Sequence, residues 1–299
     1  MMTQREQALI KRWNEFATRP RGDIFKFRSD LESFCVELGL NANLPEIGAF
    51  HEKVELRGGL NADVAVPKGN GSHPVAVFIH GGGWMAGSVQ THRKLGMRFA
   101  EQGYLTVNVD YRLAPENPFP AGFDDCVFAA KWAAENAHRW NGDPSRMVMG
   151  GDSAGANLAA AGLVALAGDS RAVKFRAAAL IYGVYDFPSM IDRAPNPAPA
   201  QAMARGYLGP NYPAALKDPR VSPLRGIKTG TLPPSFVICG TADLLLPESR
   251  SIVAALRETG TPYEAHEIDE MPHAFMMMEE LSACREGHRL MFDFLRRHV

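Results

Sequence analysis

Apolar positions follow two different spacings along the chain, and the spacing changes near residue 48. Residues 3–18 and 23–39 place apolar side chains three or four positions apart, as on one face of an α-helix. Beyond residue 48, short apolar runs alternate with longer amphipathic segments. The run at 75–79, Val-Ala-Val-Phe-Ile, has no polar position, which is typical of a strand buried on both faces. The pattern predicts two N-terminal helices followed by a region of alternating strands and helices.

The region after residue 48 favours the α/β fold class. Strands are expected at 54–57, 63–66, 75–79, 104–109, 146–149, 177–182, 235–239 and 263–268, and helices at 91–102, 121–138, 154–167, 247–259 and 279–298. This alternation predicts a mainly parallel central sheet with helices on both faces. The proline-rich stretch at 186–222 breaks it and contains one expected helix, at 198–207. An insertion of this length is usually functional.

Composition and charge narrow the class of protein. The chain has 299 residues, of which 46% are hydrophobic and 22% charged, as in ordinary soluble globular proteins. Its formal net charge is −1 and its Lys and Arg residues are scattered, so nucleic acid and anionic lipid are not expected partners. We find no membrane-spanning apolar run and no signal peptide, and expect a cytoplasmic location.

The four cysteines, Cys35, Cys126, Cys239 and Cys284, lie far apart in the sequence and include no C-x-x-C pair. Disulfide frameworks and cysteine metal sites require paired or clustered cysteines. We therefore expect reduced, mostly buried thiols and no metal.

The pentapeptide Gly-Asp-Ser-Ala-Gly at 151–155 is the first candidate for chemistry. It follows the strand expected at 146–149 and precedes a helix of small residues. A sharp strand-to-helix turn with glycine on both sides lifts a serine hydroxyl above the sheet, and the helix N-terminus then offers free N–H groups to an oxyanion. The alternative is a plain Gly/Ser turn. We expect Ser153 to be a nucleophile.

The glycine-rich segment His-Gly-Gly-Gly-Trp at 80–84 directly follows a buried strand, at the sheet edge where α/β proteins bind ligands. Its glycines leave N–H groups that can point at a carbonyl oxygen. The pattern G-x-G-x-x-A at 81–86, with Asp110 after the next strand, also imitates a dinucleotide-binding fingerprint. In that fingerprint the helix begins within the glycines, whereas here a loop extends to about Thr91. We favour an oxyanion-binding loop oriented by His80.

Two further residues complete a candidate triad. His273 lies on the loop after the last strand, where a base can reach over the sheet, whereas His266 lies within an alternating strand; the histidines at 51, 73, 138, 288 and 298 lie in polar stretches. Asp243 directly follows the strand at 235–239. The alternative is that Asp243 only caps the next helix, but Glu248 is nearer to that helix start. The order Ser153, Asp243, His273 is that of α/β-hydrolases.

Taken together, these motifs resemble those of the hormone-sensitive-lipase-like esterases, the bacterial family IV of the α/β-hydrolase fold. H-G-G-G-W at 80–84, Y-R-L-A-P-E at 111–116 and G-D-S-A-G at 151–155 carry the resemblance, and the H-x-F at 273–275 fits it. It extends from about residue 50 to the end of the chain. One segment departs from the family pattern D-P-L-x-D-E, because residues 243–248 are Asp-Leu-Leu-Leu-Pro-Glu.

The resemblance implies the remaining site residues and the reaction. The N–H groups of Gly82, Gly83 and Ala154 would form the oxyanion hole, with Asp152 and Glu248 in supporting roles. Short- to medium-chain carboxylic esters would be hydrolysed through an acyl-enzyme, without metal or cofactor. Two alternatives stay open: a formamide or lactone substrate on the same triad, and a non-catalytic receptor such as the plant gibberellin receptors, which lack the histidine that is present here.

The expected domain organisation follows from these assignments. Residues 1–45 would form N-terminal cap helices, and residues 46–299 a catalytic domain with a cap insertion at about 186–222. Apolar side chains of the cap would line the substrate pocket, namely Trp13, Phe16, Phe34, Met203, Tyr207 and Tyr212. The expected partner is a small-molecule ester, and some relatives suggest a homodimer through the final strand and helix.

Overall fold

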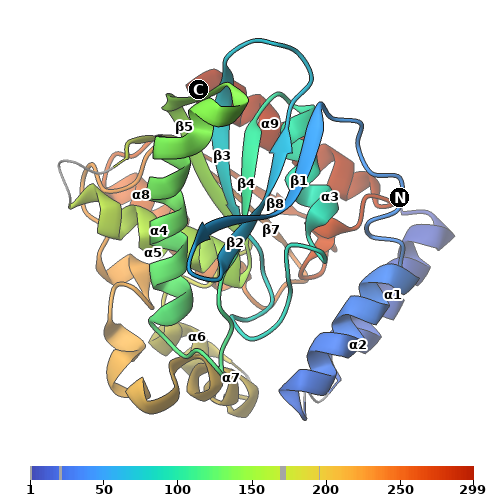
Figure 1. The fold of residues 1–299 in the computed structure, drawn as a ribbon. Helices are drawn as coiled ribbons and strands as arrows, with labels where there is room; N and C mark the ends of the chain where they lie inside the picture. The colour runs from blue at the N-terminus through green and yellow to red at the C-terminus, as the bar shows by residue number, and fades with distance from the viewer. Residues whose placement is uncertain (1, 20–21, 169–172, 195) are drawn as a thin grey trace.

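One eight-stranded sheet forms the centre of the part of the chain that the computed structural model describes, residues 2–19, 22–168, 173–194 and 196–299 (Figure 1). The strand order is β1-β2-β4-β3-β5-β6-β7-β8; β2 runs antiparallel to both neighbours and the other pairs are parallel. The strands are β1 (Ala49–Arg57), β2 (Leu60–Val66), β3 (His73–Ile79), β4 (Leu105–Asp110), β5 (Gly142–Asp152), β6 (Phe175–Ile181), β7 (Ser235–Gly240) and β8 (Tyr263–Ile268).

Helices cover both faces of the sheet, as the strand pattern predicts. They are α3 (Arg93–Glu101), α4 (Ala121–Asn136), α5 (Ala154–Ala167), α8 (Leu246–Glu258) and α9 (Ser282–His298). The odd positions of β3, such as Val77, belong to a core with α4, α5 and α8, while Phe78 belongs to a core with α3 and α9. Because both faces of β3 are buried, every residue at 75–79 is apolar.

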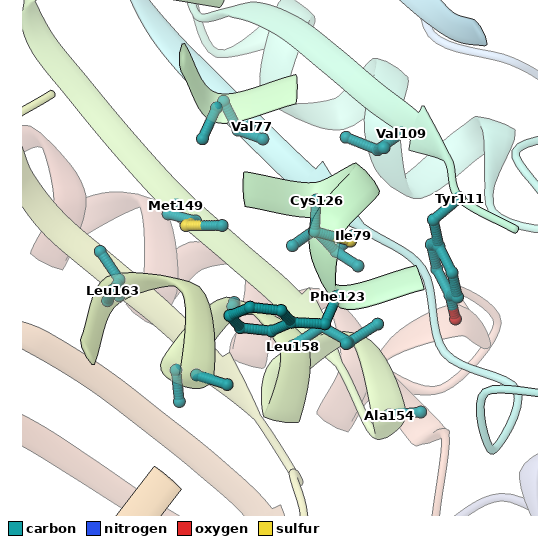
Figure 2. Packing of buried hydrophobic residues seen from close by; sticks show 14 of the residues in the cluster. Val77, Ile79, Val109, Tyr111, Phe123, Cys126, Met149, Ala154, Leu158 and Leu163 are labelled. Atoms are coloured by element: carbon teal, nitrogen blue, oxygen red, sulfur yellow. The ribbon is translucent and has the colours of Figure 1, made fainter. Parts of the chain in front are cut away.

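Figure 2 shows the first of these cores between the sheet and two helices. Val77 and Ile79 of β3 and Met149 of β5 lie beside side chains of α4 and α5. Small residues such as Ala159 and Ala160 are fully buried on α5 and let that helix pass close to the sheet. This packing fixes the position of the α5 N-terminus relative to the end of β5.

The two expected N-terminal helices are present as α1 (Gln4–Ala17) and α2 (Ile24–Glu37) and lie side by side at the periphery of the fold (Figure 1). Thr3 and Glu6 form a capping box at the start of α1. The rings of Phe16 and Phe34 stack with centroids 4.2 Å apart and hold the pair together.

The insertion contains one helix more than the pattern predicts. The expected helix at 198–207 is α7 (Ala198–Leu208), and a seven-residue helix, α6 (Phe187–Arg193), precedes it. Two turns with a proline near the start are too short to give a helical period in the sequence. Residue 195, which lies between these helices, is outside the described residues.

Candidate active site

Ser153 occupies a sharp turn between β5 and α5. Its backbone has φ +54° and ψ −118°, a conformation that costs a non-glycine residue on the order of 1–3 kcal/mol. Its N–H donates to the carbonyl of Ile181 at 2.8 Å. A Cβ on Gly151 would lie 2.4 Å from the Ile79 oxygen, and one on Gly155 would lie 1.9 Å from it. Both glycines are therefore required for this turn.

The three residues of the expected triad lie together at the carboxyl edge of the sheet. His273 Nε2 is 2.9 Å from Ser153 Oγ, and His273 Nδ1 is 2.7 Å from Asp243 Oδ2. The Asp243 side chain is only 1% exposed, whereas that of His273 is 35% exposed. This is the hydrogen-bond chain that activates a serine hydroxyl for attack on a carbonyl carbon.

The carboxylate of Asp243 also binds the backbone of its own loop, just before α8 begins at Leu246. Asp243 Oδ1 accepts the N–H of Leu245 at 2.8 Å, while Oδ2 faces His273. Leu244 stands where the family pattern has proline, and its side chain points to solvent with 86% exposure. The departure from the family pattern therefore leaves the carboxylate in reach of the histidine.

The glycine-rich segment forms a loop that passes through the left-handed backbone region at two glycines. Gly82 has φ +125° and Gly83 has φ +63°. The N–H of Ala86 donates to the Gly82 carbonyl at 2.9 Å, and α3 begins only at Arg93. A dinucleotide fingerprint would need a helix starting within the glycines, so this loop does not match it.

The N–H groups of Gly82, Gly83 and Ala154 are the three that the family resemblance implies for an oxyanion hole. Within the described ranges none of the three donates a hydrogen bond to another group of the protein. Ala154 is the first residue of α5, where the helix dipole adds positive potential. These donors are therefore available to a developing oxyanion.

Gly82→Ala is expected to lower kcat by about 10²–10³, the usual cost of losing one oxyanion donor. The new Cβ would lie 1.9 Å from the Ala86 carbonyl oxygen, so the loop backbone must move. Gly103→Ala is the matched control, because Gly103 also has a positive φ, +92°, but open space around it. Steady-state kinetics of the two variants would contradict this account if both kept wild-type kcat.

His80 is a buried, uncharged support of this loop. Its Nδ1 lies 2.8 Å from the Gly81 carbonyl, and its ring stacks on Tyr111 with centroids 4.4 Å apart. Tyr111 in turn donates its hydroxyl to the His80 carbonyl at 3.0 Å. Burial, with the nearby His92, lowers the pKa of His80 to about 3. The expectation that His80 orients the loop agrees with these contacts.

Asp152 lies directly below the same loop. Its Oδ1 accepts the Gly81 N–H at 2.9 Å, and its carboxylate faces the imidazole of His92. Burial alone would raise the pKa of Asp152, but His92 and the Gly81 N–H outweigh burial and hold the pKa below its ordinary value. Asp152 is thus an ionised buried carboxylate that fixes the loop backbone.

Glu248, which was expected in a supporting role, contacts the backbone where the insertion begins. Its Oε2 accepts the N–H groups of Tyr185 and Asp186, both at 2.8 Å, where the chain leaves β6 and enters the insertion. Burial raises its pKa, and the two N–H groups partly offset that effect. Glu248 therefore anchors the start of the insertion.

Sequence reasoning missed Asn157, which links three parts of the site. Its Oδ1 accepts the indole N–H of Trp84 at 3.2 Å, and its Nδ2 donates to the carbonyls of Val184 and Val221 at 2.8 and 2.9 Å. The glycine-rich loop, the helix after Ser153 and both ends of the insertion meet at this side chain. A single amide in an otherwise apolar helix was the available signal.

Sequence reasoning also missed His92, which is only 4% exposed. It placed two other histidines, which are in fact buried, in polar surroundings. His73 and His288 are 7% and 8% exposed, because β3 and α9 carry them into the interior. His288 Nε2 lies 2.9 Å from the Met276 carbonyl, just beyond the loop of His273. His266 faces Glu264 at 2.8 Å, away from the triad.

A partly buried ion-pair group holds the far end of the His273 loop. Glu279 accepts hydrogen bonds from Arg98 at 2.6 and 2.7 Å and pairs with Lys94 at 2.8 Å. Burial raises the pKa of Glu279, but the two α3 cations have the larger effect and lower this pKa to about 2. A depressed carboxyl pKa stabilises the fold above the ordinary value of 4.5 and loses this effect as the pH falls towards 2.

Glu279→Gln is therefore expected to lower the melting temperature at pH 7, and the difference from wild type should shrink between about pH 4.5 and pH 2. Thermal unfolding followed by circular dichroism at a series of pH values measures it. Glu280→Gln is the matched control, since Glu280 forms only an exposed pair with Arg5. A difference that stays constant with pH would contradict the ion-pair account.

Arg28 connects the N-terminal helices to the glycine-rich loop. It donates to the carbonyls of Met85 and Ala114 at 2.6 and 2.8 Å and forms a two-bond pair with Glu116. Met85 belongs to the glycine-rich loop, and the other two residues belong to the Y-R-L-A-P-E motif. α2 is thus held against the same loop that offers the oxyanion donors.

The four cysteines belong to no disulfide or metal site among the described residues. Cys35, Cys126, Cys239 and Cys284 are all free and buried, as expected. Among the described residues, no group of three or more His, Cys, Asp or Glu side chains is placed to hold a metal ion. No helix within the described ranges combines the length and apolarity needed to cross a membrane.

Comparisons with known proteins agree with this geometry. A family model described as alpha/beta hydrolase fold matches residues 76–277. The chain is 30% identical over 258 residues to the carboxylic ester hydrolase LipN of Mycobacterium tuberculosis, covering 78% of this chain and 65% of LipN. It is 50% identical to the carboxylesterase NlhH of the same species over 88 residues, 29% of this chain and 28% of NlhH. The chain thus spans less than two thirds of these relatives in the aligned regions.

Solved structures match over nearly the whole chain. An esterase from Pyrobaculum calidifontis superposes with a TM-score of 0.87 at 27% identity, covering 99% of both chains. An esterase from the bacterial hormone-sensitive lipase family superposes with a TM-score of 0.83 at 29% identity, covering 100% of this chain and 99% of the other. Because the family model also spans more than half of the sequence, the chain belongs to the α/β-hydrolase fold family, in its hormone-sensitive-lipase-like branch.

Proposed function

We propose that this chain is a carboxylesterase that hydrolyses carboxylic esters through an acyl-enzyme on Ser153. The hydrogen-bond chain from Ser153 Oγ through His273 to Asp243, with distances of 2.9 and 2.7 Å, carries the proposal. The names of the relatives, carboxylic ester hydrolase and carboxylesterase, support it.

Acylation follows from the positions of these groups. His273 Nε2 takes the hydroxyl proton as Ser153 Oγ attacks the ester carbonyl carbon. Asp243 accepts the Nδ1–H of His273, which fixes the tautomer and stabilises the imidazolium. The N–H groups of Gly82, Gly83 and Ala154 bind the oxyanion, each contributing about 3 kcal/mol. His273 then returns its proton to the alcohol oxygen, the carbon–oxygen bond breaks, and the alcohol leaves.

Deacylation runs through the same groups in reverse. His273 takes a proton from a water molecule, whose oxygen attacks the acyl carbon of Ser153. The same three N–H groups bind the second oxyanion. His273 then protonates Ser153 Oγ, and the carboxylic acid is released. No step in this sequence uses a metal or a cofactor.

The proposed cap consists of residues 1–45 and about 186–222 over the catalytic domain of residues 46–299. Arg28 ties α2 to the glycine-rich loop, and Tyr207 of α7 stacks on Trp84 of that loop with ring centroids 4.7 Å apart. Trp13, Phe16 and Phe34 pack into the interior, while Met203 and Tyr212 are only partly buried. We expect the aromatic side of α7 to limit the acyl chain to short or medium length.

Cytoplasmic location and a homodimer through the final strand and helix are further proposals, which rest on the sequence alone. Cell fractionation tests the first, and light scattering of the purified protein tests the second.

A substrate panel tests the ester assignment against its alternatives. Purified protein is assayed with p-nitrophenyl acetate, butyrate and laurate, with N-formylkynurenine, and with a γ-lactone. We expect the highest kcat/KM with acetate or butyrate. Turnover confined to the formamide or the lactone would overturn the ester assignment while keeping the triad. Absence of turnover on every substrate, together with absence of fluorophosphonate labelling, would favour a binding protein on this scaffold.

A further inference from the structure

A buried polar contact lies beneath the glycine-rich loop, outside the triad. His92, at the N-cap of α3, has a side chain only 5% exposed, and that of Asp152 is 3% exposed. His92 Nε2 lies 3.3 and 3.4 Å from the two carboxylate oxygens of Asp152. Sixty positions separate these residues in the sequence, so the fold alone brings them together.

The carboxylate of Asp152 transmits this contact to the loop. Its Oδ1 accepts the N–H of Gly81, the residue directly before Gly82. A Cβ on Gly81 would lie 2.5 Å from Asp152 Oδ2, so the carboxylate packs directly against the loop backbone. The Gly81 N–H belongs to the peptide between His80 and Gly81, so a rotation of the carboxylate would move that peptide. The movement would pass through Gly81 to the next peptide, which carries the Gly82 N–H, an oxyanion donor in the proposed mechanism.

The imidazole of His92 is itself held in one orientation. Its Nδ1 lies 2.9 Å from Thr91 Oγ1, and Thr91 is bound in turn to the backbone of Ser88 through both the N–H and the carbonyl. This leaves Nε2 to face Asp152. A buried carboxylate needs such a partner, because removing one member of a buried charged pair leaves the other without compensation.

Few other charged groups face His92. His80 lies beside it with ring centroids 5.5 Å apart, and Lys94, Glu279 and His288 line a small cavity next to it. Glu279 is already paired with Lys94 and Arg98, and His288 with the Met276 carbonyl. Asp152 is therefore the carboxylate that His92 contacts.

We propose that His92 is a positioning residue for the oxyanion hole, acting through Asp152 on the N–H of Gly81 and so on the neighbouring Gly82. The inference rests on the proposed hydrolase function. His92 touches neither the substrate nor the triad; it keeps the carboxylate in the rotamer that holds the loop. Its loss should weaken binding of the transition state and leave binding of the ground-state ester unchanged.

Two substitutions that differ by one methylene test this role. His92→Gln carries an amide N–H long enough to donate to Asp152, whereas His92→Asn is too short to reach it. His73→Asn is the control for removing a buried histidine, because His73 lies at the start of β3, at the opposite end of that strand from the site. Active-site titration with a fluorophosphonate counts the folded sites in each preparation, so misfolded protein does not enter the comparison.

The measurements are kcat and KM for p-nitrophenyl butyrate and the inhibition constant of a trifluoromethyl ketone, whose hemiketal oxyanion occupies the hole. For His92→Asn we expect kcat to fall by up to about 10², the cost of a misplaced group, with KM unchanged. The inhibition constant should rise by the same factor. His92→Gln and His73→Asn should stay close to wild type in all three values.

Three results would overturn the inference: His92→Asn equal to His73→Asn in kcat, His92→Gln as impaired as His92→Asn, or a lower kcat with an unchanged inhibition constant. Each of these leaves the hydrolase function intact, since the wild type still turns over ester. A wild type that neither hydrolyses esters nor reacts with the fluorophosphonate would instead refute the proposed function itself.

Discussion

Ser153→Ala is expected to lower kcat for p-nitrophenyl butyrate by about 10⁶, the loss seen when a serine nucleophile that works with a histidine base is removed. The hydroxyl oxygen that lies 2.9 Å from His273 Nε2 is then absent, so no acyl-enzyme forms. The conformation at φ +54° is as unfavourable for alanine as it is for serine, so the substitution adds no backbone strain and the fold should persist. Steady-state kinetics of the variant measure the loss of kcat, and thermal unfolding measures whether the fold persists.

Ser249→Ala is the matched control for this loss. Ser249 is also a buried serine, 4% exposed, but it lies on α8 and takes no part in the proposed reaction. Its replacement should leave kcat near the wild-type value. Ester hydrolysis by Ser153→Ala at a rate close to that of Ser249→Ala would show that another group is the nucleophile.

Asp243→Asn is expected to lower kcat by about 10⁴. The amide keeps an oxygen that can accept the Leu245 N–H, so the loop should hold its shape. Its NH₂ group, however, cannot accept the Nδ1–H of His273, so the imidazole is left in the wrong tautomer to take the serine proton. Steady-state kinetics of the variant measure the loss.

Asp269→Asn provides the comparison, because Asp269 is an exposed acid on the loop that precedes His273. Its substitution should leave kcat unchanged. A loss below about tenfold for Asp243→Asn would mean that a different acid supports His273 and that the role proposed for Asp243 is wrong.

The fold was predictable because its signals are local. The apolar run at 75–79 predicts a strand covered on both faces, and helices do cover both faces of β3. Ser153, Asp243 and His273 were found because each follows the end of a strand directly, and parallel strands bring their carboxyl ends to one edge of the sheet. Position along the chain was enough to bring these three together.

What the sequence could not predict depends on contacts between distant segments. His92 faces Asp152 across sixty positions, and no local pattern distinguishes it from an ordinary helix-cap residue. Asn157 joins the glycine-rich loop to the insertion through backbone carbonyls, which no side-chain pattern encodes. Glu248 was expected only in a supporting role, and the sequence did not show that it binds the backbone where the insertion begins.

Labelling with a fluorophosphonate, followed by intact-mass measurement and peptide mapping, tests the central claim most directly. The reagent phosphonylates an activated serine and stops the reaction at the first covalent step. The account predicts one adduct per chain, located on Ser153, that forms in parallel with the loss of ester hydrolysis and is absent from Ser153→Ala. An adduct on another residue, or hydrolysis that continues in fully labelled protein, would contradict it.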